Sequence, residues 1–358
     1  MKIGKYEIKH PIIQGGMGVG ISWDQLAGTV SKEGGLGVIS GVGTGYYKEN
    51  KDLLIKMKRD KPVDVMNFYS KDALKRIIDN ARKICGDAPL ACNILYASND
   101  YGRIVEDACE AGINIIITGA GIPTNMPQFT KNYPDVALIP IVSSARALKL
   151  ICKKWKRYNK LPDAVIVEGP LSGGHQGFTY EQCFQDEYQL EKIVPPVIEE
   201  AKNWGNPPII AAGGIWDKND IDKYLEMGCS GVQMATRFIG TFECDADANF
   251  KNVLLNAKAD DITLMKSPVG LPARGVQTNL QKTMEEGTAP KVVCISNCVA
   301  PCHRGVEAKA VGYCIADRLG AAYQGDTDTG LFFTGSNGYK LNKIISVHEL
   351  MEKLTKGE

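Results

Sequence analysis

Short apolar segments recur along the 358-residue chain and alternate with longer segments of helical periodicity. The apolar segments contain few polar residues, which is typical of strands buried on both faces of a parallel sheet. We predict strands at Ile12–Gln14, Leu36–Ser40, Leu90–Leu95, Ile115–Thr118, Leu138–Val142, Ala164–Val167, Ile209–Ala212 and Gly231–Met234. The predicted helices are Trp23–Glu33, Ser70–Ile84, Tyr101–Ala111, Ser144–Lys156, Pro195–Trp204 and Lys218–Met227. This alternation predicts an α/β fold, a (β/α)8 TIM barrel.

A doubly wound open sheet is the alternative architecture for such a pattern. That fold would need a glycine fingerprint that opens a helix, with an acidic residue at the expected distance. The glycines of Gly41–Gly45 do not have this spacing. The sequence therefore favours the barrel, whose active site lies at the carboxyl ends of its strands.

Glycine-rich turns follow several of the predicted strands. Gly15, Gly16 and Gly18 follow the first strand, and Gly213 and Gly214 follow the seventh. In such barrels the loops after the seventh and eighth strands commonly bind phosphate through backbone N–H groups. We therefore expect a phosphate-bearing cofactor near Gly213, Gly214 and Thr236. For each turn alone, the alternative is a glycine that a tight turn requires.

One of only four histidines, His175, lies in the glycine-rich turn after the sixth predicted strand. Histidine has an unperturbed pKa near neutrality, so a histidine at this position can act as an acid or a base. The alternative is a loop histidine whose ring bonds backbone groups. The position at the active-site end of the barrel favours the catalytic interpretation.

From about residue 245 the sequence changes character. A helix is expected over Asn249–Lys258 and another over Val347–Leu354, and Met265–Gly275 reads as a loop across the barrel mouth. Four cysteines follow with the spacing Cys-x3-Cys-x3-Cys-x11-Cys, namely Cys294, Cys298, Cys302 and Cys314. Four thiolates can hold zinc or an iron–sulfur cluster, and the spacing favours the cluster. Buried free thiols remain the third alternative.

Composition excludes several classes of protein. The net charge of +1 argues against nucleic-acid binding, and 44% hydrophobic residues suit a protein with a large buried core. No signal peptide or membrane-spanning segment is evident, so a cytoplasmic protein is expected. The basic run Lys153–Arg157 reads as a solvated helix face, although it could attract an acidic partner.

Taken together, Pro11–Met17, Glu168–His175, Ala212–Ile215 and Gln233–Phe238 resemble the nitronate monooxygenase and FMN-dependent enoyl-ACP reductase family. The resemblance implies a flavin-binding TIM barrel with His175 as the catalytic histidine. It implies that the residues holding FMN are Gly15, Gly16, Met17, Gly18, Asn93, Gly173, Gly174, Gly213, Gly214, Gln233, Met234 and Thr236. Ala235 departs from the glycine that many members carry, which should narrow the approach to the phosphate slightly.

The cysteine spacing, together with Gly177-Phe178 and Pro268–Arg274, resembles one branch of this family, the bacterial decanoyl-ACP dehydrogenase/isomerases of unsaturated fatty acid synthesis. This resemblance implies a [4Fe-4S] cluster on the four cysteines and acyl carrier protein as partner, and it is compatible with a homodimer. It divides the chain into an FMN-binding barrel, residues 1–244, and a substrate-covering segment, residues 245–358. Nitronate monooxygenase, enoyl-ACP reductase and a non-enzymatic flavin or iron–sulfur sensor are the rival functions.

Overall fold

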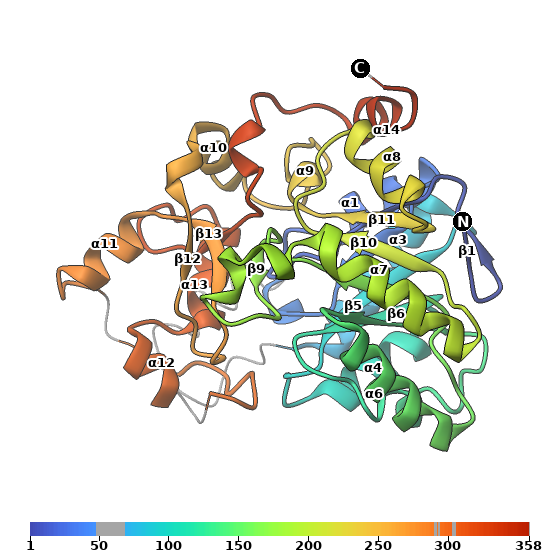
Figure 1. The fold of residues 1–358 in the computed structure, drawn as a ribbon. Coiled ribbons are helices and arrows are strands. Elements are labelled where there is room, and N and C mark those ends of the chain that lie inside the picture. The colour runs from blue at the N-terminus through green and yellow to red at the C-terminus, as the bar shows by residue number, and fades with distance from the viewer. Residues whose placement is uncertain (48–68, 290–291, 293, 303–305, 358) are drawn as a thin grey trace.

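The structure is a computed structural model, and it describes residues 1–47, 69–289, 292, 294–302 and 306–357 (Figure 1). Eight parallel strands form its central sheet in the spatial order β3-β11-β10-β8-β7-β6-β5-β4. Their bounds are β3 (Ile12–Gln14), β4 (Gly37–Ser40), β5 (Leu90–Leu95), β6 (Ile115–Gly119), β7 (Ala137–Val142), β8 (Val165–Glu168), β10 (Ile209–Ala212) and β11 (Gly231–Met234). All eight predicted strands are confirmed, with boundaries that differ by at most one residue.

The sheet closes on itself between its two outer strands, β3 and β4. A parallel bridge joins Ile13 to Leu36, the residue just before β4. Two backbone hydrogen bonds support it, from the Gln14 N–H to the Leu36 carbonyl at 3.0 Å and from the Leu36 N–H to the Ile12 carbonyl at 2.9 Å. The sheet is therefore a barrel, as predicted, and the open doubly wound sheet is excluded.

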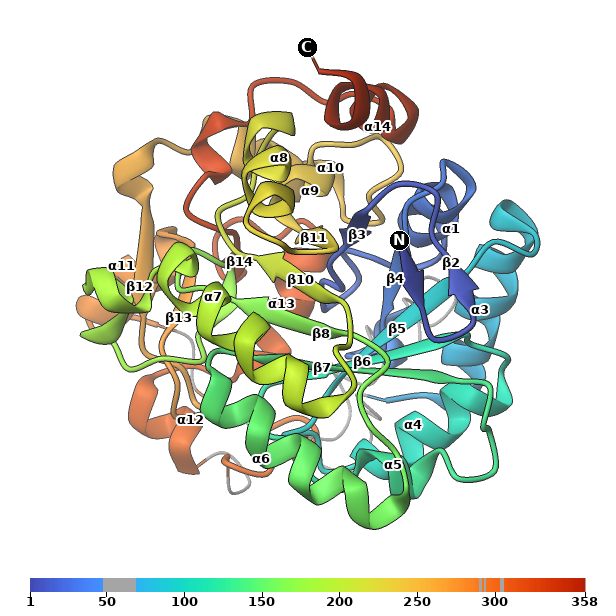
Figure 2. The same cartoon turned by 45° about the vertical axis from the view of Figure 1, so that its right-hand side comes forward.

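Helices surround the barrel, and Figure 2 shows them outside the strands. They are α1 (Asp24–Lys32), α3 (Lys71–Cys85), α4 (Tyr101–Glu110), α5 (Met126–Phe129), α6 (Ala145–Trp155), α7 (Leu190–Ala201), α8 (Lys218–Glu226) and α9 (Thr236–Ile239). The predicted start of α7 at Pro195 is wrong. The helix begins five residues earlier and carries Pro195 and Pro196 inside it. None of the helices in the described part of the chain combines the length and apolar character needed to cross a bilayer.

The core has two apolar layers. The inner layer fills the barrel with strand residues such as Ile13, Ile117 and Ile166, all fully buried. The hairpin of β1 (Lys2–Ile3) and β2 (Tyr6–Glu7) extends this layer, since Ile3 packs into it. The outer layer lies between the strands and the helices and includes the fully buried Trp155. Alternate strand residues enter one layer or the other, so both faces of every strand are covered.

The C-terminal residues add a second, antiparallel sheet beside the barrel (Figure 1). The elements are α10 (Ala248–Asn256), β12 (Ile262–Met265), β13 (Ala273–Val276), α11 (Asn279–Glu285), α12 (Val306–Val311), α13 (Ile315–Tyr323), β14 (Phe332–Phe333) and α14 (Val347–Lys356). The predicted loop over Met265–Gly275 is therefore wrong at both ends. Its ends pair as β12 and β13, and only residues 266–272 form the loop. The strand β9 (Gly174–His175) after β8 pairs with β13.

A buried carboxylate joins the C-terminal part of the chain to the first helix of the barrel. Asp245 Oδ2 accepts hydrogen bonds from the N–H groups of Trp23 at 2.8 Å and Leu26 at 3.2 Å, and its Oδ1 accepts one from Gln25 at 3.2 Å. Trp23, at the N-cap position of α1, makes no side-chain cap of its own. Asp245 thus satisfies the free N–H groups at the start of a helix more than 200 residues earlier in the chain.

We predict that Asp245→Ala lowers the free energy of unfolding by about 3 kcal/mol, because buried backbone N–H groups lose a charged acceptor. Asp247→Ala is the matched control. Asp247 caps α10 through one hydrogen bond at an exposed site, so its loss should cost about 1 kcal/mol. Urea denaturation followed by circular dichroism measures both. An equal loss of unfolding free energy in the two variants would show that Asp245 contributes no more than an exposed helix cap does.

Candidate active site

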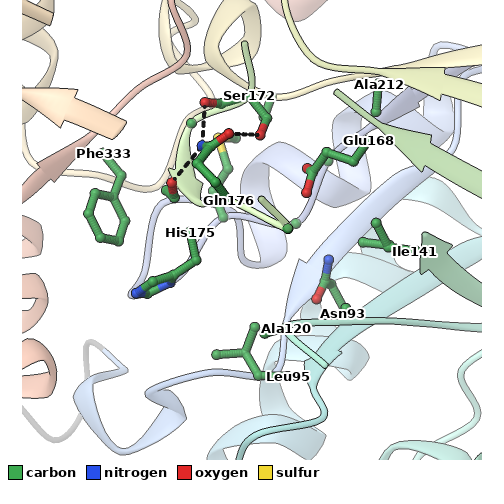
Figure 3. Close-up of a pocket in the computed structure, with 18 of the residues that line it drawn as sticks. Asn93, Leu95, Ala120, Ile141, Glu168, Ser172, His175, Gln176, Ala212 and Phe333 are labelled. Carbon is green, nitrogen blue, oxygen red and sulfur yellow. Dashed lines mark hydrogen bonds between the residues drawn. The ribbon is translucent and has the colours of Figure 1, made fainter. Parts of the chain in front are cut away.

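A cavity of about 860 Å³ opens at the carboxyl ends of the barrel strands. Every residue that the sequence assigns to the catalytic or cofactor site lines this cavity, from Gly15 on the first turn to Thr236 after β11. Figure 3 shows His175, Glu168 and Asn93 around it, contributed by β9, β8 and β5. The structure brings these residues together, and their individual roles remain predictions.

One end of the cavity is built from backbone that only glycine suits. Gly213 and Gly214 have φ angles of +104° and +79°, in a region that side chains disfavour. A Cβ on Gly173 would lie 2.6 Å from the Thr334 carbonyl carbon. Backbone without side chains therefore lines this end of the cavity, and Gly173 packs directly against the chain at Thr334, which fits a phosphate bound by N–H groups.

Residues 334–337, which we call the C-terminal segment, complete the same end of the cavity. Their place in the site was not predicted from the sequence. The Gly335 N–H donates to Thr236 Oγ1 at 2.8 Å, and the Asn337 side chain donates to the Gly214 carbonyl at 2.6 Å. The only sequence signal was a change from apolar to polar residues after Phe333. These hydrogen bonds hold the C-terminal segment against the turns after β10 and β11.

The opposite part of the cavity fits a flat cofactor with polar edges. A Cβ on Gly16 would lie 2.4 Å from the Asn93 Cβ, so the first turn lies directly against the end of β5. Gln233 Oε1 is buried and has no hydrogen-bond partner among the described residues. A buried acceptor without a donor is costly, and an N–H of a bound ligand would satisfy it. The flavin ring of FMN carries such an N–H, so these residues fit FMN.

His175 is fixed by three contacts with the C-terminal part of the chain. Its backbone pairs with Ala273 of β13, its Nε2 lies 2.7 Å from Ser267 Oγ, and its ring meets Phe333 edge to face at 5.4 Å between centroids. Burial lowers the pKa of His175 to about 4. The imidazole is therefore neutral at neutral pH and can accept a proton.

A second titratable group, for which no role was predicted from the sequence, lines the cavity. Glu168 ends β8, and Figure 3 shows its carboxyl group directed into the cavity on the side of Asn93. Burial raises the pKa of Glu168 to about 7. The sequence signal was an acidic residue between a buried strand and a glycine turn. The cavity thus holds two groups that titrate outside their usual ranges.

The four cysteines of the predicted cluster site lie in one region next to the cavity. Cys298 lines the cavity, and the backbone of Cys298 and Val299 bonds the loop after β5, through Asn99 and Ser98. Burial is the main cause that raises the pKa of Cys298 to about 12, and the nearby thiols Cys314, Cys294 and Cys302 contribute to the increase. However, the described residues contain no group of three or more His, Cys, Asp or Glu side chains that could hold a metal ion. The predicted metal site is therefore not formed in this structure.

Comparison with known proteins extends over nearly the whole chain, since residues 1–357 match the family described as nitronate monooxygenase. A probable nitronate monooxygenase of Staphylococcus saprophyticus is 28% identical over 297 residues, which cover 79% of this chain and 80% of that protein. The (3aS,4S,5R,7aS)-5-hydroxy-7a-methyl-1-oxo-octahydro-1H-indene-4-carboxyl-CoA dehydrogenase of Rhodococcus jostii is 27% identical over 282 residues, covering 78% of this chain and 65% of that protein.

Among solved structures, FabK from Thermotoga maritima superposes with a TM-score of 0.71 and 26% identity over 98% of this chain and 93% of that chain. The fold, the family match and the flavin-compatible cavity agree. The chain belongs to the nitronate monooxygenase family, whose enzymes use FMN, and it is a flavin-dependent oxidoreductase.

Proposed function

We propose that the protein dehydrogenates and isomerises a medium-chain acyl group carried by acyl carrier protein, converting decanoyl-ACP to trans-2-decenoyl-ACP and then to cis-3-decenoyl-ACP. The observation that carries this proposal is the apolar lining that the C-terminal part of the chain adds around His175. Its side chains include Val269, Leu271, Leu319, Leu331 and Phe333. The volume of about 860 Å³ is near the upper end of ligand cavities, roughly 300–1,000 Å³, so a cofactor and an acyl chain have room together.

FMN is the proposed cofactor. Its phosphate would be held by Gly173, Gly213, Gly214 and Thr236. Gly15, Gly16, Met17, Gly18, Asn93, Gly174, Gln233 and Met234 are the proposed contacts of the rest of the cofactor. Bound FMN supplies the hydride acceptor for oxidation at the β-carbon. Residues 1–244 are the proposed cofactor-binding barrel, and residues 245–358 are the proposed cover over the substrate.

His175 is the proposed base. The thioester carbonyl acidifies the α-proton, and a neutral imidazole in the cavity can remove it. Once that first proton has passed to solvent and the imidazole is neutral again, it can take a proton from Cγ and deliver it to Cα, which moves the double bond from the 2- to the 3-position. The contact with Ser267 limits rotation of the ring and keeps it at the cavity.

The cysteines are the proposed ligands of a [4Fe-4S] cluster, and the support is their spacing and shared location. Thiolates are the preferred ligands of such clusters. The thiols of Cys298, Cys294, Cys302 and Cys314 are close enough to influence one another's charge. Cys298 also lines the cavity, so a cluster there would lie beside the proposed flavin site.

Nitronate monooxygenase is the second candidate function, because the family match and the Staphylococcus saprophyticus relative carry that name. A nitronate is small and would use His175 without the apolar lining. The name of the Rhodococcus jostii relative, a carboxyl-CoA dehydrogenase, favours a thioester instead. Reduction of an enoyl-ACP with a nicotinamide donor is the reverse chemistry in the same cavity.

His175→Ala should retain the visible spectrum of bound flavin and lose turnover by about 10²–10⁴-fold, because the base is removed while the cofactor contacts remain. His10→Ala is the control, since His10 lies outside the cavity in the N-terminal part of the chain. Turnover is measured with decanoyl-ACP, with propyl nitronate, and with an enoyl-ACP plus NADH. Dehydrogenation that survives in His175→Ala would exclude this histidine as the base. Turnover of propyl nitronate alone would support the second candidate.

Glu168→Gln should raise the melting temperature of the flavin-free protein by a few degrees at pH 8 and change it little at pH 5. The pKa of Glu168 rises from about 4.5 in the unfolded chain to about 7 in the fold. The folded carboxyl group is therefore mostly neutral at pH 5, and stability is lost as the pH rises from about 4.5 to about 7, because the unfolded chain loses the proton that the folded chain still holds. Glutamine cannot ionise, so the variant keeps that stability. A difference in melting temperature between variant and wild type that does not grow from pH 5 to pH 8 would contradict the raised pKa of Glu168.

Cys298→Ser should lower both iron and acid-labile sulfide in protein purified without air, because a cluster loses one of four ligands. Cys152→Ser is the matched control, since Cys152 is buried in α6 away from the other thiols. Metal analysis and the visible spectrum give the result independently of activity. Unchanged iron in Cys298→Ser, or zinc in the wild type, would refute the cluster.

A further inference from the structure

The outer face of α6 carries a row of positive charge that begins at the mouth of the cavity. Arg146 lines the cavity, and Lys149 and Lys153 follow it at positions i+3 and i+7, on one side of the helix. All three side chains are exposed. No carboxylate in the described ranges pairs with any of them, and residues 145–160 contain no acidic residue. No acidic residue of α6 therefore neutralises the positive charge of Arg146, Lys149 and Lys153, which we call the basic row.

The neighbouring helix does not compensate the charge either. Helix α7 packs against α6 (Figure 2) and carries Glu191, Glu199 and Glu200. These three acids have other partners, which are Lys223, Lys202 and the Trp204 indole N–H. Electrostatic attraction to this row is thus available to a partner molecule.

Helix electrostatics explain only part of the row. Cations near the carboxyl end of a helix interact favourably with its dipole, which accounts for Lys153 and for Lys154 beside it. Arg146 lies in the first turn, where the dipole disfavours a positive charge. The helix dipole therefore does not account for a positive charge at Arg146, beside the cavity mouth. A negatively charged ligand group at the mouth supplies an explanation.

Exposed apolar side chains surround the same mouth. Ile122, Leu150 and Leu171 are 40%, 38% and 37% exposed, although most large apolar side chains of the protein are buried. They follow β6, β7 and β8, three adjacent strands of the barrel, and all three line the cavity. An apolar rim beside a basic helix face is typical of a surface that binds an amphipathic partner.

We propose that this surface, the row Arg146, Lys149 and Lys153 with the rim Ile122, Leu150 and Leu171, docks an acidic carrier protein whose acyl arm enters the cavity. The inference rests on the proposed function and deepens it by locating the partner. The row runs about 10 Å along the helix from Arg146 to Lys153. A free thioester seated in the cavity would meet Arg146 at the mouth. Lys149 and Lys153 lie farther from the mouth along the side of the barrel, so only a larger acidic surface reaches them.

The test is the charge-reversed double variant Lys149→Glu/Lys153→Glu. With decanoyl acyl carrier protein, its KM should rise at least tenfold while kcat stays unchanged, because docking is weakened and chemistry is not. Increasing the salt concentration should raise the KM for decanoyl acyl carrier protein more in the wild type than in the variant, because salt screens the attraction that the variant has lost. With decanoyl-pantetheine, which has no carrier protein, the kinetic constants should match those of the wild type. Lys131→Glu is the control, because Lys131 is exposed and belongs to the segment before β7, outside the basic row on α6.

Binding of fluorescently labelled holo acyl carrier protein, followed by anisotropy, separates the two proposals. If the wild type turns over neither thioester but binds the carrier protein more tightly than the double variant does, the proposed reaction fails and the docking surface stands. If the double variant and Lys131→Glu show the same affinity, the docking surface is refuted whatever the activity. Equal KM increases for decanoyl acyl carrier protein and decanoyl-pantetheine would refute it too, because the row would then bind the arm and not the protein.

Discussion

The pairing of β9 with β13 is the contact on which the site depends. His175 and Gly174 pair with Ala273 and Arg274, and the Gln176 N–H donates to the Pro272 carbonyl at 2.8 Å. Without this pairing the histidine turn would be an ordinary mobile loop of a barrel. With it, the turn becomes a strand of the C-terminal sheet. The barrel supplies the position of the histidine, and the later part of the chain supplies its orientation.

Low polarity around the cavity governs its proton chemistry. Burial lowers the pKa of His175 and raises the pKa of Glu168, so a single physical cause favours the neutral form of both groups. Neither shift needs a charged neighbour, since desolvation is the only cause in each case. A cavity that suppresses charge suits an apolar acyl chain, and it leaves the histidine unprotonated over most of the pH range in which proteins fold.

The barrel could be predicted from the sequence because each strand is a continuous apolar segment that ends at glycine or a small polar residue. The start of α7 could not, since Pro195 and Pro196 suggested a first helical turn, where proline is common, and the structure places them in the interior. The hairpin β12–β13 was missed because two prolines and two glycines obscure its alternation.

The location of the glycines and of His175 at the cavity could be predicted because each lies in a turn that follows a barrel strand. Their partners could not. Ser267 is 92 residues from His175, and Gly335 is 99 residues from Thr236, with no local pattern that links them. The cysteines were visible by their spacing, but spacing alone does not determine how their sulfur atoms are arranged.

The position of Asp245 has a consequence for synthesis on the ribosome. The start of α1 is complete only when this residue, 222 positions after Trp23, has left the exit tunnel. The barrel also needs β11, its last strand, to lie beside β3, its first. A nascent chain therefore carries an unfinished first helix and an open sheet edge until nearly all of the barrel has been made.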